Sequence, residues 1–211
     1  MRSLRTTLFA LSAALLLAAP ALAQPPRGGM QRGGGGIGML LGNKSVQDEL
    51  KITDDQKKKI EEFAAKQQEA RRGMQDLSQE ERREKNQELT KQAEAFAKEV
   101  LTADQQKRIK QIVIQTAGLR AFAMEDVVKE LKLTDEQKEK LKALSDDMRK
   151  DQQELFSGGG DQQENMKKFQ ALNKEYLTKA SALLTDEQKK VWTELTGKPF
   201  ELKMEMRRTD R

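Results

Sequence analysis

The stretch Leu133-Thr134-Asp135-Glu136-Gln137 decides the fold, because the chain contains nearly the same five residues four times. The other copies are Ile52-Thr53-Asp54-Asp55-Gln56, Leu101-Thr102-Ala103-Asp104-Gln105 and Leu184-Thr185-Asp186-Glu187-Gln188. One such stretch begins many ordinary helices, but four in register make an internal repeat, which determines the architecture before any other feature is considered.

Each copy predicts the start of a helix. The Thr hydroxyl can accept a hydrogen bond from a first-turn amide while the Gln three residues later reaches back to the Thr amide, which makes a capping box. The acidic residues between them favour the positive end of the helix dipole. The leading apolar residue is expected to pack against Ile60, Ile109, Leu141 or Trp192 further into its helix. We therefore assign a structural, helix-capping role to the first, second and fifth residues of the copies: Ile52, Thr53, Gln56, Leu101, Thr102, Gln105, Leu133, Thr134, Gln137, Leu184, Thr185 and Gln188.

The spacing of the copies predicts two tandem repeats. Thr53 and Thr134 are 81 residues apart, and Thr102 and Thr185 are 83 apart. A third helix start recurs within each repeat, at Ser78 with Glu81 and at Asp161 with Glu164. Each repeat should thus contain a short lead-in helix, a long helix, a turn, a second long helix and a last helix.

The N-terminal segment has the features of an export signal. Arg2 and Arg5 precede the apolar run Leu8 to Leu17, and Ala21-Leu22-Ala23 is a small-x-small cleavage site. We therefore predict an exported protein with a signal peptide at 1–23, cleaved after Ala23. The predicted order continues with a flexible Gly/Pro-rich linker at 24–44, a first helical repeat at 45–118, a second at 119–197 and a loosely packed tail at 198–211.

The composition predicts an all-α fold of tandem helical hairpins with short capping helices. Residues 45–197 are rich in Lys, Glu, Gln, Leu and Ala and contain no Pro. Only 36% of the chain is hydrophobic, and the apolar residues form narrow stripes at helical spacing. Narrow stripes favour two-helix seams over a thick core, so we expect an elongated molecule.

The composition also argues against several function classes. The chain has no His and no Cys, which removes the usual general base, nucleophile pair and zinc ligands. We therefore expect no enzyme activity, no cofactor and no metal site. Loss of Arg2 and Arg5 with the signal would lower the net charge from +5 to +3. Because the charges are interleaved and aromatic residues make up 4%, we do not expect nucleic-acid binding.

With its paired Leu-Thr-x-x-Gln motifs and export signal, the chain resembles the LTXXQ-motif family of periplasmic proteins, which includes the Spy and CpxP envelope-stress proteins. The resemblance covers about residues 45 to 197. It implies a long helical hairpin, usually dimerised into a thin curved cradle. Members commonly carry two motifs, so four suggest that the two repeats pair as an intramolecular pseudo-dimer, the alternative being a homodimer. Another branch binds zinc through histidines, a role that this chain does not share.

The resemblance implies an ATP-independent chaperone that holds unfolded or partly folded proteins of the cell envelope. Such a surface needs basic groups for long-range attraction and soft apolar groups for contact. The candidates are Lys57, Lys58, Arg71 and Arg72, with Met74, Leu77, Met148, Phe156, Met166 and Phe169. At each position the alternative is a solvated helix face or seam packing. The alternatives for the whole protein are an envelope-stress adaptor that docks on a sensor protein and a structural helical spacer.

Overall fold

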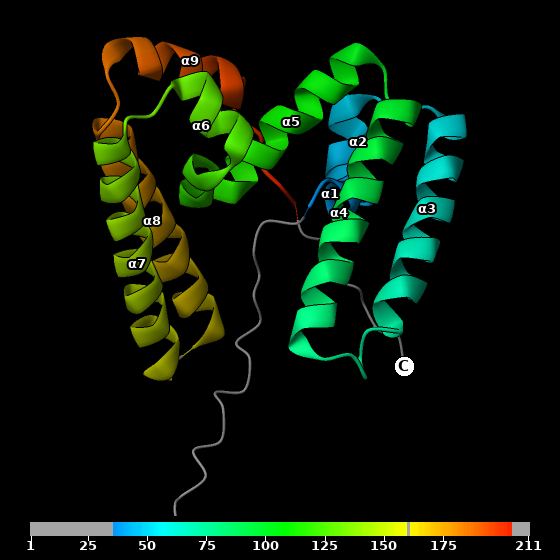
Figure 1. Ribbon diagram of the computed structural model, residues 1–211, viewed down its shortest axis with the longest axis horizontal. Coiled ribbons are helices and arrows are strands. Elements are labelled where there is room, and N and C mark those ends of the chain that lie inside the picture. Colours follow the sequence, from blue (N-terminus) through cyan, green and yellow to red (C-terminus); the bar gives the residue numbers. More distant parts are fainter. Residues whose placement is uncertain (1–35, 160, 204–211) are drawn as a thin grey trace, which may run out of the picture. The chain divides into compact units, whose positions relative to one another are not determined.

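All regular secondary structure in residues 36–159 and 161–203, which the computed structural model describes, is helical (Figure 1). The first repeat contains α1 (Ile37–Leu41), α2 (Lys44–Leu50), α3 (Asp54–Arg72), α4 (Gln79–Val100) and α5 (Ala103–Ala117). The second contains the 3₁₀ helix η1 (Gly118–Ala123), α6 (Glu125–Leu131), α7 (Asp135–Ser157), α8 (Gln162–Ala182) and α9 (Asp186–Thr196). The all-α prediction is confirmed. The curved cradle stays a prediction, and the predicted signal peptide lies outside the described residues.

The two repeats agree in backbone detail as well as in helix order. The segment η1–α6 follows α1–α2 at the same offset of 81 residues that separates Thr53 from Thr134. The short helices α2 and α6 end at Lys51 and Lys132, which both take the left-handed conformation, with φ of 53° and 48°. This conformation lets the amide of each Lys close the last turn and turns the chain towards the next Thr cap.

The buried apolar side chains form two clusters. We call the first core the cluster of Leu40, Leu41, Val46, Leu50, Ile60, Ala97, Leu101, Ile109 and Ile112. We call the second core the cluster of Ile114, Leu119, Ala121, Phe122, Val127, Leu131, Leu133, Leu141, Tyr176, Ala180 and Leu184. Helix α5 belongs to both, because Ile109 and Ile112 lie on one of its faces and Ile114 on another. Apart from Tyr176, no residue with a polar or charged side chain is buried among the described residues.

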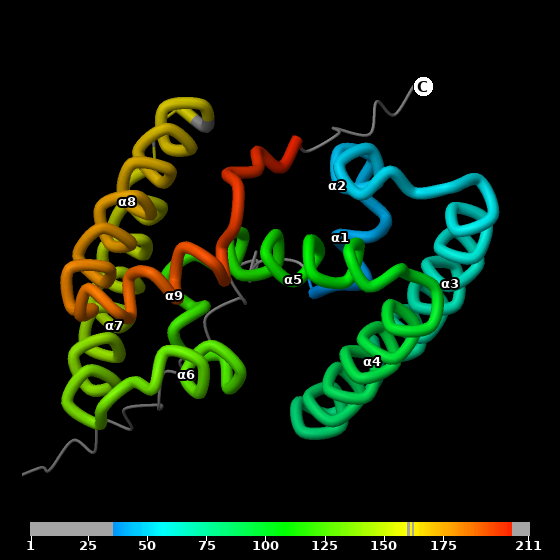
Figure 2. The backbone as a smooth tube through the Cα atoms, turned by 90° about the horizontal axis from the view of Figure 1, so that it is seen from above, coloured from blue at the N-terminus to red at the C-terminus, as the bar shows by residue number. Residues whose placement is uncertain are grey.

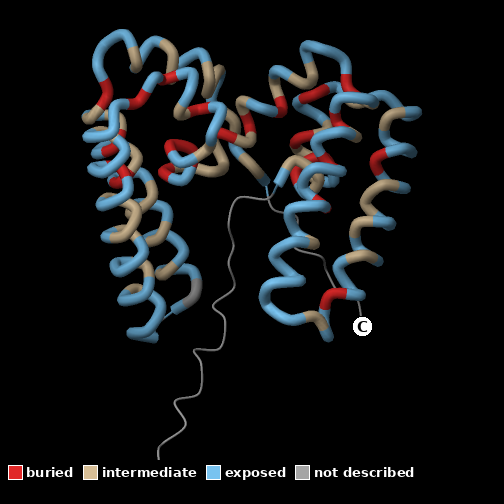
Figure 3. Tube along the Cα trace, viewed as in Figure 1, coloured by how far each residue is buried: buried red, intermediate tan, exposed pale blue. Residues whose placement is uncertain are grey.

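Stacked aromatic pairs join neighbouring helices in both repeats. Phe63 of α3 stacks on Phe96 of α4 with ring centroids 4.2 Å apart. Helix α1 lies close to α3 and α4: a Cβ on Gly38 would lie 3.7 Å from Phe63 Cε1 and 3.2 Å from the Cβ of Ala93. In the second core, Phe122 stacks on Trp192 with centroids 4.3 Å apart. Figure 3 shows buried positions in α1, α2, α4, α5, η1 and α6, whereas the turns of α7 and α8 next to their connecting loop are exposed or half-buried.

Two predicted boundaries are wrong. Residues 37–44 were expected in the linker, but α1 lies there and buries Leu40 and Leu41 in the first core. This short apolar run is surrounded by glycines, so the composition of the segment predicts a linker. The predicted loose tail is wrong at residues 198–203, because Phe200 and Leu202 pack on the first core. Residues 24–35 and 204–211 lie outside the described part of the chain.

Candidate functional site

All four repeated stretches form the predicted capping boxes. In each, the Thr Oγ1 accepts a hydrogen bond from the Gln backbone amide, and the Gln Oε1 accepts one from the Thr amide. For Thr134 and Gln137 the two distances are 3.2 and 3.1 Å. The leading residues Leu101, Leu133 and Leu184 are buried and Ile52 is half-buried, each in the cluster that holds its expected partner.

The motif glutamines also bind one another, which the sequence reading did not predict. In the second repeat, Gln137 Nε2 donates to Gln188 Oε1 at 2.7 Å, and Gln188 Nε2 donates to Gln137 Oε1 at 2.9 Å. Each amide also donates to the main chain just before the other motif: Gln137 to Leu183 O at 2.8 Å and Gln188 to Leu131 O at 3.0 Å. The two amides therefore clamp the starts of α7 and α9 together.

The first repeat contains the same clamp. Gln56 and Gln105 exchange hydrogen bonds of 2.8 and 3.1 Å. Gln56 Nε2 also donates to Val100 O at 2.8 Å, and Gln105 Nε2 to Leu50 O at 3.0 Å. Each Gln thus caps its own helix and joins it to another, which explains physically why both motifs of a repeat end in Gln. In the sequence, the contact between the two glutamines is indicated by the occurrence of the motifs in pairs.

The third helix start differs between the repeats. Ser78 and Glu81 form a full capping box, and the hydrogen bonds from Ser78 lower the pKa of Glu81. Asp161 caps α8 by accepting from the amides of Gln163 and Glu164. The carboxylate of Glu164 pairs with Lys168 at 2.8 Å, and this partner lowers its pKa. The predicted equivalence therefore holds for the cap but not for the reciprocal box.

Three of the candidate client-binding residues gather where α7 ends and α8 begins, and we call Phe156, Met166 and Phe169 the apolar tip. The Phe156 and Phe169 rings lie 5.8 Å apart at a tilt of 50°. Phe156 is 54% exposed, Met166 is 37% exposed and Phe169 is half-buried. Met166 and Phe169 lie three residues apart in α8 and so share a face of the helix.

The equivalent end of the first hairpin is polar. At the offsets of the two repeats, Phe156, Met166 and Phe169 correspond to Gln75, Arg83 and Asn86. Met74, proposed as a client contact, is only 7% exposed, so as an accessible contact it is wrong, because its side chain packs inward. Leu77 and Met148 are half-buried, and Met148 packs against the second core.

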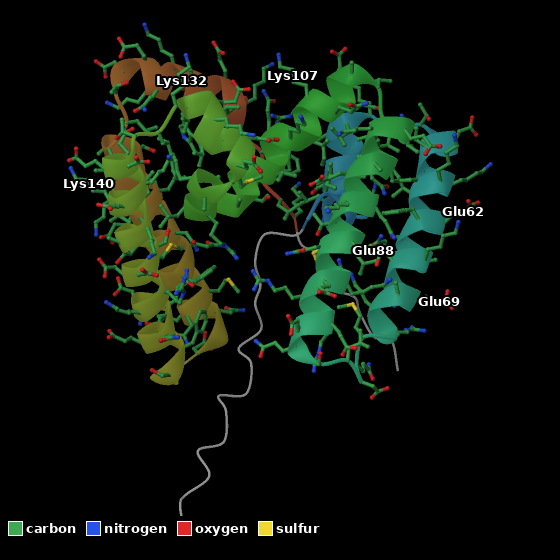
Figure 4. The ribbon with its side chains drawn as sticks, in the orientation of Figure 1. Glu62, Glu69, Glu88, Lys107, Lys132 and Lys140 are labelled. Atoms are coloured by element: carbon green, nitrogen blue, oxygen red, sulfur yellow. The ribbon has the colours of Figure 1, made fainter. Side chains whose placement is uncertain are left out.

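The four candidate basic residues lie on α3, where Lys57, Lys58, Arg71 and Arg72 are all exposed. They do not gather with the apolar tip, which is on the other hairpin. Most ion pairs among the described residues join exposed side chains of one helix, such as Lys140 with Glu136 at 2.7 Å. Figure 4 shows Glu62 and Glu69 pointing outward from α3 and Lys140 outward from α7. Such pairs contribute little stability and mainly keep the surface soluble.

One ionisable side chain lies in the second core. The hydroxyl of Tyr176 on α8 donates to Asp151 Oδ2 on α7 at 2.7 Å, and this bond raises the pKa of Tyr176 to about 12. Tyr176 is 5% exposed. The contact ties the two long helices together between the core and the apolar tip.

Comparison with known proteins bears on the second repeat. Residues 120–183 match the LTXXQ motif family. The match covers less than a third of the 211-residue chain. The matched residues include all of α6, α7 and α8 and the motif from Leu133 to Gln137. Neither a curated protein nor a solved structure matched the chain.

Two further features are absent from the described residues. In residues 36–159 and 161–203, no helix is both long and apolar enough to cross a bilayer. The same residues contain no group of three or more acidic side chains placed to hold a metal ion.

Proposed function

We propose that this LTXXQ-family protein is an exported, ATP-independent chaperone of the periplasm that binds unfolded or partly folded proteins and limits their aggregation. The observation that carries the proposal is the apolar tip, where Phe156 is more than half exposed beside Phe169 and Met166. An aromatic pair that is partly exposed to solvent gives a surface suited to apolar partners. The proposal includes no enzymatic step and no cofactor.

The chemistry of the tip suits many weak partners. Methionine and phenylalanine offer contact area without fixed polar geometry, so one surface can accept different apolar segments. The exposed carboxylates and amines that flank the tip keep the free protein soluble. Glu154, Asp161, Lys167 and Lys168 lie within this flanking region and are exposed.

The test is light scattering from a reduced, aggregating client protein, with increasing amounts of residues 24–211 and no nucleotide. We expect dose-dependent suppression near stoichiometric ratios. The double variant Phe156→Ser with Met166→Ser should lose most of the suppression while its circular dichroism spectrum stays unchanged. The matched control is Gln75→Ser, at the position of the first hairpin that corresponds to Phe156, which should act like the wild type.

Two results would contradict the proposal. Absence of suppression across several clients would remove the chaperone function, and tight binding to one folded envelope protein would then favour an adaptor. Full suppression by the double variant would move the contact surface away from the apolar tip.

A further inference from the structure

The segment after α9 lies on the first repeat in an extended form. We call residues 197–203 the strap. Figure 2 shows it leaving the end of α9 and running towards α2. Phe200 and Leu202 are half-buried against the first core, whereas Glu201 and Lys203 between and after them are exposed. This alternation is that of an extended chain with one face against apolar side chains.

Side chains of the first repeat bind the main chain of the strap. The Gln115 amide donates from Nε2 to Lys198 O at 2.8 Å and accepts at Oε1 from Phe200 N at 2.8 Å. Gln115 therefore makes, with the main chain of residues 198 and 200, the two hydrogen bonds that a neighbouring β-strand would make. Gln115 also donates to Thr196 O, so the contact begins at the last turn of α9.

Three more polar side chains complete the contact. Arg108 donates from one guanidinium nitrogen to Lys198 O at 2.9 Å, while its Nε bonds Glu49 at 2.7 Å and so fixes its direction. At the far end, Asn43 Nδ2 donates to Lys203 O at 2.9 Å, and Ser45 Oγ accepts from Lys203 N at 3.3 Å. All of these partners on the strap are main-chain atoms, which every peptide possesses.

From this geometry we propose that α1, α2 and α5 form a binding groove for extended peptides with apolar side chains at alternate positions, and that the strap is its built-in occupant. The groove recognises main-chain groups through Asn43, Ser45, Arg108 and Gln115, and two apolar side chains through the first core. A peptide that replaced the strap needs only an apolar-x-apolar sequence in an extended form. Use of the groove for unfolded clients rests on the proposed function, but peptide binding itself does not.

The strap should suppress binding of other peptides in the resting protein. Its link to α9 holds it near the groove at an effective concentration of roughly millimolar. The strap contact is nevertheless local, since Phe200 and Leu202 are only half-buried and the residues around them are exposed. Weakening these two side chains should free the groove without removing any residue that forms it.

The experiment measures binding of a fluorescent peptide with the sequence of residues 196–203 to residues 24–211, by fluorescence anisotropy. The variant Phe200→Ser with Leu202→Ser should bind this peptide about tenfold or more tightly than the wild type does, because its own strap competes less. The control Glu201→Ser changes an exposed strap residue and should bind like the wild type. Adding Gln115→Leu to the double variant should abolish the gain.

A second peptide tests main-chain recognition. Methylation of the Phe nitrogen removes the hydrogen that Gln115 Oε1 accepts, so this peptide should bind the double variant at least several-fold more weakly.

Equal binding of the two peptides, or no gain in a double variant that keeps the wild-type circular dichroism spectrum, would overturn the proposal. If the double variant does not fold, Phe200→Ala is the substitute and should show a smaller gain. No gain in folded Phe200→Ala would equally overturn the proposal. The aggregation assays with Phe156 variants test the proposed function separately, so their results do not depend on the peptide-binding results.

Discussion

Replacement of Gln137 by Leu tests whether the paired glutamines hold each repeat together. The Gln137 side chain takes part in four hydrogen bonds, to Thr134 N, Leu183 O and both polar atoms of the Gln188 amide. Three of these are part-buried, and a typical hydrogen bond contributes about 0.5–1.5 kcal/mol net, so the loss should be about 2–4 kcal/mol. For a chain of this size that lowers Tm by roughly 5–15 °C.

The assay is urea denaturation followed by far-UV circular dichroism, with Gln153→Leu as the control. Gln153 lies exposed on the same helix α7, so its replacement should change the free energy of unfolding by less than about 0.5 kcal/mol. Because the two glutamines share their bonds, adding Gln188→Leu to Gln137→Leu should cost less than the sum of the single changes.

The variant Gln137→Glu separates pairing from capping. A Glu at this position can still accept from Thr134 N, but its carboxylate cannot donate to Leu183 O or to Gln188. We expect a loss at neutral pH that shrinks as the pH falls towards about 4, because the protonated carboxyl regains one donor. The reasoning is refuted if Gln137→Leu is no more destabilising than Gln153→Leu. A Gln137→Glu variant as stable as the wild type at neutral pH would show that only the capping matters.

Two other changes have definite expected signs. Tyr176→Phe should cost about 1 kcal/mol at neutral pH in urea denaturation. Because the folded-state pKa of Tyr176 is raised to about 12, the stability from its bond to Asp151 is fully present below pH 10 and falls as the pH rises from about 10 to 12. The Phe variant should lack this fall, and equal pH profiles would contradict the assignment. Lys132→Gly should raise the free energy of unfolding by about 0.5–1 kcal/mol, since Lys132 has a φ of 48°, whereas Lys129→Gly within α6 should lower it; thermal melts distinguish the two signs.

The helix starts were predictable from the sequence because capping is local. Thr53, Ser78, Thr102, Thr134 and Thr185 each bind an amide three residues away, so five or six residues contain the whole signal. The glutamine clamps join residues about 50 positions apart, and no local pattern reports such a distance. The proposal that the repeats form a pseudo-dimer also stays a prediction, which the concentration dependence of the mass in light scattering checks.

Burial was harder to predict than helix formation. Met74 and Phe156 both lie near the end of a long helix and are both apolar, yet one is buried and the other is more than half exposed. The position of a residue along a helix indicates which face of the helix it lies on, but not which other element covers that face. Likewise Phe200 follows a Gly-Lys-Pro helix stop, which is a sound reason to expect a tail, and only the tertiary fold places the first core beneath it.

The double membership of α5 bears on how the protein unfolds. Ile112 and Ile114 are two residues apart in one rigid helix, yet they belong to different cores. If the first core melts, α5 loses the support of Ile109 and Ile112, and Ile114 loses the fixed helix that holds it in the second core. A chain with two repeats can unfold one repeat at a time. Here the shared helix α5 should couple the two cores, so that both unfold in a single cooperative transition. A partly unfolded intermediate with one intact repeat should then be scarce, so the apolar side chains of one core should not become exposed while the other core stays folded.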